Sequence, residues 1–231
     1  PPDPQGRSYR TAYLWEEVLA RDSLLDLLAR FLHLQIDEKR DEQGRKVKTE
    51  QLVFPRYHQL QAVRSLVAAA KTEGPGHNYL VEHSAGSGKS NTIAWLTHRL
   101  ASLHDDSVIV ITDRVVLDQQ LQDNIYQFEH KQGVVQKIDE SSRQLAEALT
   151  SAVPIIITTL QKFPFVSRQL LKMAEERGDA GSGRLQTRRC AVVIDEAHSS
   201  QGGETATELK GVLGGEDLHE EARRQAAEDG A

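Results

Sequence analysis

The stretch EHSAGSGKS, from Glu82 to Ser90, decides how the rest of the chain is interpreted. It follows the nucleotide-binding pattern G-x-x-x-x-G-K-S/T except at His83, which stands where the pattern has its first glycine. A phosphate-binding loop of this kind needs a strand before it and a helix after it. The apolar run NYLVEH (78–83) predicts the strand, and SNTIAWLTHRL (90–100) has the apolar spacing of a helix. These surroundings favour a phosphate-binding loop over a Gly/Ser loop with a solvated lysine.

The residues of this loop suit contact with a triphosphate. Gly86 and Gly88 tolerate positive φ, so successive backbone N–H groups can point at phosphate oxygens, and His83 belongs to the few other types that tolerate it. The following helix adds the partial positive charge of its N-terminus. Lys89 can reach the β- and γ-phosphates, and the Ser90 hydroxyl can hold Mg²⁺. The predicted nucleotide-binding residues here are Ser84, Ala85, Gly86, Ser87, Gly88, Lys89, Ser90 and Asn91.

A second motif, VVIDEAH (192–198), is an apolar strand that ends in two adjacent acids. Asp195 can bind Mg²⁺, and Glu196 is then placed to polarise the water that attacks the γ-phosphate. The alternative is an acidic helix start, because Asp and Glu suit helix N-termini. His198 has no role that chemistry alone assigns, since a lone histidine is more often a hydrogen-bonded structural residue.

A polar cluster lies upstream in FPRYHQLQAV (54–63). Gln59 could read the amino edge of adenine with two hydrogen bonds, and Arg56 or Tyr57 could stack on the base. An ordinary helix start after Pro55 explains the same residues equally well.

Short apolar runs alternate with helical patterns from Phe54 onward, which predicts an α/β fold with a parallel sheet flanked by helices. The predicted strands are 78–83, 107–114, 134–138, 154–163 and 190–198. The predicted helices are 57–71, 89–104, 115–128, 141–150 and 164–176. Before them, residues 11–36 predict a helical pair or one bent helix, and the charged residues 37–50 predict an exposed hairpin or linker.

Composition excludes some classes of protein. The 231 residues are 39% hydrophobic without any run long enough for a transmembrane helix, and PPDPQGRSYR (1–10) lacks the apolar core of a secretory signal. One cysteine, Cys190, cannot form an intramolecular disulfide, which favours the cytoplasm. The formal net charge of −6 argues against a uniformly basic surface for nucleic acid, but a local groove can still bind phosphates. Because Met173 is the only methionine, we expect the chain to begin inside a longer gene product.

With these residues assembled, the chain resembles superfamily 2 helicases and translocases, and most of all the motor subunit of type I restriction enzymes. The matching motifs are R-x-x-Q (Arg56 to Gln59), HSAGSGKS, ITDRVVLDQQL, TTLQKF and DEAH. The phrases TDRVVLDQQLQDNIYQFEH, IIITTLQKFPF and DEAHSSQ are similar to the restriction subunit in particular. The resemblance covers about residues 10–213.

The resemblance implies a RecA-like P-loop NTPase domain that uses ATP and Mg²⁺ and moves on double-stranded DNA. It implies residues 1–53 as a helical linker segment after a nuclease domain, 54–213 as the first RecA-like domain, and 214–231 as a polar tail before a second one. The second domain would supply an arginine finger, so we expect this chain alone to bind ATP but hydrolyse it slowly. The implied partners are the methyltransferase and specificity subunits.

The resemblance also implies which residues face DNA. They are Thr112, Asp113, Arg114, Thr158 and Thr159, whose short polar groups could bind phosphates without reading bases. Simple β-propensity is the alternative for the threonines. His198 would couple the nucleotide site to neighbouring motifs and counts with Lys89, Asp195 and Glu196 as catalytic.

Two other functions stay open from the sequence. A superfamily 2 RNA or DNA helicase of another system would share the same motor core, and a nucleotide-binding scaffold would bind ATP without turnover. The tripeptide ELK (208–210) fits part of a nuclease pattern, but its polar helical surroundings indicate a helix surface.

Overall fold

The computed structural model describes residues 11–40, 43–104, 107–112, 121–122, 124–127, 133–138, 141–166, 169–170, 172–173 and 190–196. The chain divides into two compact units, Pro1–Leu60 and Gln61–Ala231. Helix α2 (Tyr57–Glu73) begins in the first unit and ends in the second. The predicted tail 214–231 lies outside the described residues.

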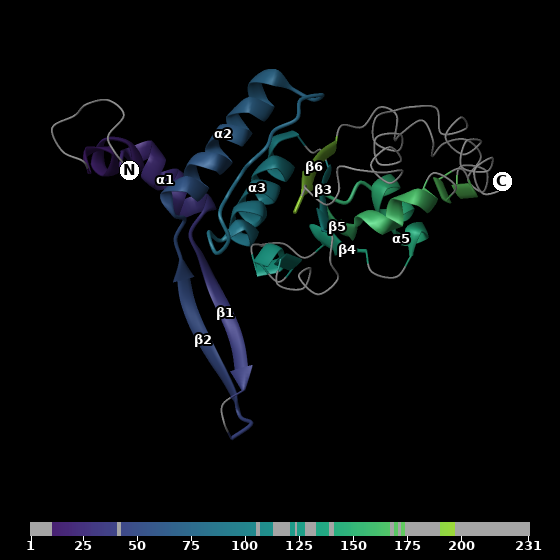
Figure 1. The fold of residues 1–231 in the computed structure, drawn as a ribbon, viewed down its shortest axis with the longest axis horizontal. Helices are drawn as coiled ribbons and strands as arrows, with labels where there is room; N and C mark the ends of the chain where they lie inside the picture. Colours follow the sequence, from purple (N-terminus) through teal and green to yellow (C-terminus); the bar gives the residue numbers. More distant parts are fainter. Residues whose placement is uncertain are drawn as a thin grey trace. The chain divides into compact units, whose positions relative to one another are not determined.

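The first unit combines two short helices with a β-hairpin (Figure 1). A π-helical turn, η1 (Leu14–Val18), and helix α1 (Arg21–Arg30) come first. Strands β1 (His33–Arg40) and β2 (Lys46–Val53) then pair antiparallel, with Leu34 opposite Leu52. The predicted helical stretch therefore ends earlier than expected, and the hairpin is longer than 37–50. Pairing with β2 overrides the helical spacing of the last apolar residues, since a strand is defined by a distant partner.

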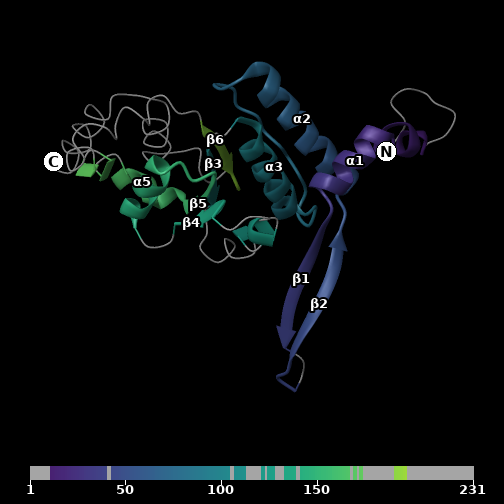
Figure 2. The same cartoon turned by 180° about the vertical axis from the view of Figure 1, so that it is seen from behind.

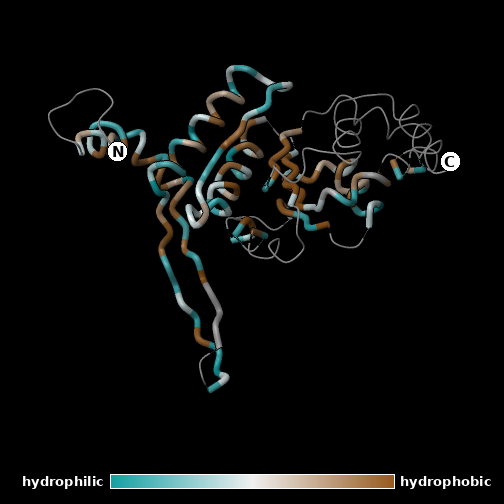
Figure 3. The backbone as a smooth tube through the Cα atoms, viewed as in Figure 1, coloured by the Kyte–Doolittle hydropathy of each residue, from teal (hydrophilic) through white to brown (hydrophobic). Residues whose placement is uncertain are grey.

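The second unit is built on a four-stranded sheet in the order β4-β5-β3-β6. Its strands are β3 (Ser107–Thr112), β4 (Val135–Lys137), β5 (Ile155–Thr159) and β6 (Cys190–Ile194). Every pairing in this sheet is parallel. Figure 3 shows the apolar character of the two central strands, β3 and β5, which are buried along their length. The prediction of a parallel sheet is confirmed, and burial is confirmed for β3 and β5, whereas β4 and β6 keep partly exposed side chains.

Helices cover both faces of this sheet (Figures 1 and 2). Helix α3 (Lys89–His104) contacts β3, β5 and β6, and helix α5 (Ser142–Thr150) lies on the opposite side. Leu145 and Leu149 of α5 pack in one buried cluster with Ile109 of β3 and Ile156 of β5. The predicted helices 57–71, 89–104 and 141–150 are confirmed within two residues at each end.

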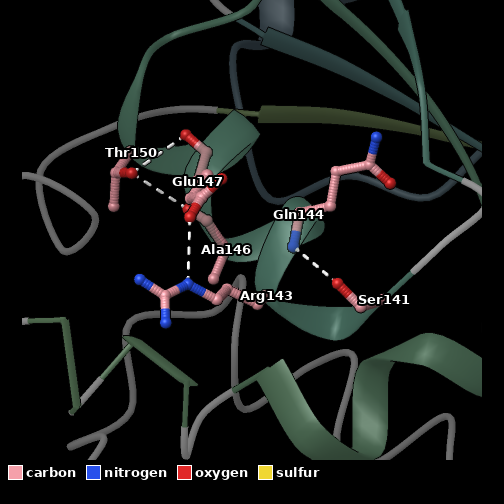
Figure 4. A network of polar contacts seen from close by, with 6 residues as sticks. All are labelled: Ser141, Arg143, Gln144, Ala146, Glu147 and Thr150. Carbon is pink, nitrogen blue, oxygen red and sulfur yellow. Dashed lines mark hydrogen bonds and ion pairs between the residues drawn. The ribbon is translucent and has the colours of Figure 1, made fainter.

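Polar contacts fix the start and the exposed face of α5, as Figure 4 shows. The Ser141 hydroxyl accepts a hydrogen bond from the Gln144 backbone N–H, at 3.3 Å, and so caps the helix. Arg143 pairs with Glu147 one turn later, and the Thr150 hydroxyl donates to backbone carbonyls of the last turn. These contacts orient the helix that closes one face of the sheet.

The prediction of a strand over residues 78–83 is wrong, because no strand forms there. Leu80 in its centre keeps 79% of its surface exposed, and Tyr79 and Val81 are also exposed. A strand requires backbone hydrogen bonds to a neighbour, and none of the described strands pairs with this segment. The apolar pattern of residues 78–83 favours an extended backbone, but a local pattern cannot provide the neighbouring strand with which they would have to pair.

The other predicted elements end differently from expectation or fall partly outside the described residues. β5 ends at Thr159, and a 3₁₀ helix, η2 (Leu160–Phe165), replaces the end of the predicted strand 154–163. Residues 121–122 and 124–127 are helical within the predicted helix 115–128. Of the predicted helix 164–176, residues 166, 169–170 and 172–173 are described and helical.

Candidate nucleotide-binding site

The loop before α3 has the backbone that phosphate binding requires. Gly86 and Gly88 adopt φ of +75° and +83°, and the Ser87 N–H donates to the Ser84 carbonyl at 3.2 Å. His83 needs no left-handed backbone, because among the described non-glycine residues only Ala152 and Glu196 have positive φ. The histidine therefore occupies its unusual position in an ordinary conformation.

Helix α3 begins at Lys89 and carries no acidic residue in its first turn. The partial positive charge of its N-terminus is therefore not offset by its own side chains. The Thr92 N–H donates to the Gly88 carbonyl at 3.3 Å, which closes the first turn of the helix against the loop. Ser90 and Asn91, which follow the lysine, are half-buried in this turn. The loop and the helix together have the arrangement that P-loop proteins use to bind anions, and phosphate binding by them stays a prediction.

The acids after β6 lie at the same place. The Lys89 Nζ donates to the Glu196 Oε1 at 2.8 Å, across 107 residues of sequence. Asp195 is held by a hydrogen bond from its backbone N–H to the Ile111 carbonyl, which continues the pairing of β6 with β3. The amine and both carboxylates thus converge at the carboxyl ends of the strands, where open α/β sheets bind their ligands.

The charged groups in this cluster shift one another's pKa values. The hydrogen bond to Glu196 raises the pKa of the Lys89 amine, burial opposes this, and the charges of Glu196 and Asp195 raise it further. Burial raises the pKa of the Asp195 carboxyl, and the neighbouring Glu196 carboxylate adds to that shift. A backbone hydrogen bond from Glu196 and the charge of Lys89 partly offset both effects. A divalent cation beside Asp195 would favour its ionised form.

The donors present fit Mg²⁺. In the described part of the chain, no group of three or more His, Cys, Asp or Glu side chains could hold a metal ion by itself. Mg²⁺ does not need such a group, because it binds through one or two carboxylates together with substrate phosphates and water. Ser90 and Asp195 offer the hard oxygen atoms that this ion prefers. They would hold the cation that neutralises phosphate charge.

The predicted adenine-reading residues belong to the first unit. The Arg56 backbone N–H donates to the Gln59 Oε1 at 2.8 Å, so Gln59 closes the start of α2 in the way that a glutamine caps a helix. Gln59 is buried, and Tyr57 is exposed with its ring edge-on to Tyr13. The helix-start explanation accounts for this hydrogen bond, and adenine recognition by Arg56, Tyr57 and Gln59 stays a prediction.

The threonines predicted to face DNA lie at the ends of β3 and β5. Thr112 pairs with Thr159, and Thr158 pairs with Ile111, so Thr112 and Thr158 point to opposite faces of the sheet. All three threonines are buried, and the hydroxyls of Thr112 and Thr158 have no hydrogen-bond partner among the described residues. Their contact with DNA stays a prediction. Asp113, Arg114 and His198 lie outside the described residues.

The sequence did not single out Asn124 and His98, although the structure ties both to this region. The Asn124 Nδ2 donates to the Asn91 Oδ1 at 3.0 Å, and the His98 Nε2 donates to the Ile125 carbonyl at 2.9 Å. No local pattern could have indicated these contacts, because Asn124 and Asn91 are 33 residues apart in the sequence, and His98 and Ile125 are 27 residues apart.

This fold and site define the class of the protein, a helicase-like ATPase with a RecA-like α/β domain. Residues 58–217 match the SWI2/SNF2 ATPase family, and the chain therefore belongs to that family. Among the described residues, no helix has both the length and the apolar character to cross a bilayer.

Curated relatives point to one group of enzymes. The chain is 31% identical over 155 residues to the type I restriction enzyme SauCOLORF180P endonuclease subunit of Staphylococcus aureus strain COL. The same identity and length apply to the SauMSSORF170P endonuclease subunit of strain MSSA476. In each case the match covers 66% of this chain and 15% of the relative, so the similarity concerns a small part of those subunits.

Proposed function

We propose that this chain is the ATP-binding and ATP-hydrolysing motor domain of a type I restriction endonuclease subunit, and that it drives translocation on duplex DNA before cleavage. The observation that carries the proposal is the 2.8 Å contact between Lys89 and Glu196, because it joins the phosphate-binding loop to the acids after β6. The match to the SWI2/SNF2 ATPase family and the similarity to restriction endonuclease subunits support the same assignment.

Each group then has a separate task in phosphoryl transfer. Lys89 binds the β- and γ-phosphates, and the backbone N–H groups from Ser84 to Gly88 bind their oxygens. Ser90 and Asp195 hold Mg²⁺, whose charge offsets that of the phosphates when it is bound. Glu196 accepts a proton from the attacking water and orients it in line with the bond that breaks. Positioning and electrostatic stabilisation supply the rate, since this reaction needs little covalent chemistry from the protein.

The same proposal assigns the remaining predicted residues. Arg56, Tyr57 and Gln59 recognise the adenine base, and His198 couples the nucleotide site to neighbouring motifs. Thr112, Asp113, Arg114, Thr158 and Thr159 bind the DNA backbone at the ends of β3 and β5. The methyltransferase and specificity subunits are the proposed partners, and the cytoplasm is the proposed location.

The test is the ATPase activity of the whole protein with duplex DNA, single-stranded DNA or RNA, beside its Lys89→Ala variant. We expect stimulation by duplex DNA and loss of ATP binding in the variant. Stimulation by RNA alone would indicate an RNA helicase instead. ATP binding without turnover, together with normal function of a Glu196→Gln variant, would indicate a nucleotide-binding scaffold.

A further inference from the structure

Two hydrogen bonds connect helix α3 to the helical residues 124–127. The first joins the Asn124 Nδ2 to the Asn91 Oδ1, and the second joins the His98 Nε2 to the Ile125 carbonyl. Asn91 and His98 are two helical turns apart on α3, so they lie on one face of it. Both contacts therefore hold the same segment to the same side of the helix.

The contact of Asn91 with Asn124 lies at the end of α3 that is nearest to the phosphate-binding loop. Asn91 follows Ser90, the proposed magnesium ligand, and stands in the first turn of the helix that begins at Lys89. A movement of this turn when phosphates bind would reach Asn124 directly through the amide–amide hydrogen bond. Because both amides sit in a half-buried or buried setting, water competes poorly for this contact.

The segment that contains Asn124 follows strand β3 in the sequence. Residues 113–120 join the end of β3 at Thr112 to the segment that contains Asn124. Leu121 and Ile125 are one helical turn apart and almost fully buried, so the segment is fixed in the core. A displacement of Asn124 therefore cannot be absorbed by a loose surface contact.

We infer that Asn124 is a positioning residue that couples the nucleotide-binding loop to the DNA-facing end of β3 through its hydrogen bond to Asn91. His98 supports the same coupling from the next turns of α3. This inference rests on the proposed function, since it needs DNA to act at the end of β3. It goes further by assigning a role to a residue outside the proposed nucleotide-binding and DNA-binding residues.

The experiment uses the whole protein and measures ATP turnover with and without duplex DNA. We expect the Asn124→Ala variant to keep its DNA-independent turnover and its ATP affinity. Its stimulation by DNA should fall by at least about fivefold, which is the lower end of coupling between linked sites. Binding measurements give the coupling separately: the effect of DNA on ATP affinity and the effect of ATP on DNA affinity must be equal, and both should decrease in Asn124→Ala.

A matched control lies on the same segment. Gln122 is also a buried amide, but its Nε2 has no hydrogen-bond partner in the part of the chain that the structure describes. A Gln122→Leu variant should therefore keep the full stimulation by DNA. In a double-mutant cycle, Asn124→Ala should have no further effect once Asn91 is replaced by alanine, because the hydrogen bond is already lost.

Circular dichroism separates coupling from misfolding. An unchanged helical signal and an unchanged thermal midpoint in Asn124→Ala would show that the variant remains folded. If that variant does not fold, His98→Ala and His98→Gln decide the question, since glutamine retains a donor and should restore coupling that alanine removes.

The outcomes distinguish this inference from the function on which it rests. A wild-type protein whose ATP turnover ignores DNA would overturn both. A wild-type protein that DNA stimulates, with an Asn124→Ala variant that it stimulates equally, would overturn the inference alone. Loss of stimulation in Asn124→Ala but not in Gln122→Leu would support it.

Discussion

The amine of Lys89 lies 2.8 Å from the carboxylate of Glu196, and the two side chains expose 39% and 36% of their surfaces. An ion pair so open to water contributes only about 0.2–1 kcal/mol, because solvent screens it. A triphosphate on the loop would compete for the same amine with far more charge. The pair therefore shows that the loop and the acidic motif meet, but it is too weak to prevent nucleotide binding.

The first prediction concerns Glu196→Gln. Loss of the competing charge should tighten the binding of a non-hydrolysable ATP analogue by about fivefold at most, because the ion pair is worth no more than about 1 kcal/mol. Hydrolysis should fall by at least about 10²-fold, as expected when a general base is removed. Calorimetric titration and a phosphate-release assay measure the two effects. Glu82→Gln is the control, and weaker analogue binding by Glu196→Gln would contradict the prediction.

The second prediction concerns Asp195→Asn and pH. Burial and Glu196 raise the pKa of Asp195 above its ordinary 3.8, so the folded state binds this proton more tightly than the unfolded state. The free energy of unfolding should therefore decrease as pH rises from about 3.8 through the raised pKa. Asp195→Asn should remove this decrease and stabilise the protein at neutral pH, while it weakens the Mg²⁺ dependence of ATP binding. Denaturant titrations at several pH values measure the free energy of unfolding of both proteins. An Asp195→Asn variant that is less stable than the wild type at pH 7 would refute the prediction.

The third prediction compares two glycines. Gly86 in the loop and Gly74 after α2 have φ of +75° and +74°, and a Cβ at either would meet nothing within 4 Å. Alanine at either position should thus cost about 1–2 kcal/mol of unfolding free energy through backbone strain alone. Only Gly86→Ala should also weaken ATP binding, because only that residue belongs to the phosphate-binding loop. Equal ATP affinity in both variants would remove Gly86 from the site.

The fourth prediction concerns the buried hydroxyl of Thr112. It has no hydrogen-bond partner among the described residues, so Thr112→Val should raise the free energy of unfolding by about 1 kcal/mol. Thr150→Val is the control, and it should lower the free energy of unfolding. The Thr150 hydroxyl donates a hydrogen bond to the Ala146 carbonyl at 3.0 Å, which valine would lose. Chemical denaturation measures both variants. Unchanged duplex-DNA affinity of Thr112→Val in the whole protein would exclude this threonine from the predicted DNA contacts.

Local composition was enough to predict the buried parts of the fold. The runs SVIVIT, IIITT and CAVVI are almost continuously apolar and β-branched, and they became β3, β5 and β6. The start of α3 at Lys89 followed from the glycine-rich loop before it. The roles predicted for Lys89, Asp195 and Glu196 required these residues to lie together, and the contact of Lys89 with Glu196 shows that they do, although the described residues 78–83 before the loop form no strand.

Features that depend on a distant partner could not be predicted in this way. Residues 78–83 have the composition of a strand but pair with none of the described strands. His33 to Ile36 look helical but pair with β2. The contact between Asn91 and Asn124 joins two polar residues whose local sequence gives no reason to bring them together.

The hairpin of β1 and β2 has one further consequence. Its ladder runs from His33 opposite Val53 to Arg40 opposite Lys46, and every described side chain of β2 is at least partly exposed. Among the described side chains of the ribbon, only His33 is buried, and a two-stranded ribbon with so little burial is marginally stable in water, whereas β3 and β5 are buried along their length. In a hydrogen–deuterium exchange experiment, the backbone amides of β1 and β2 should therefore exchange long before those of β3 and β5.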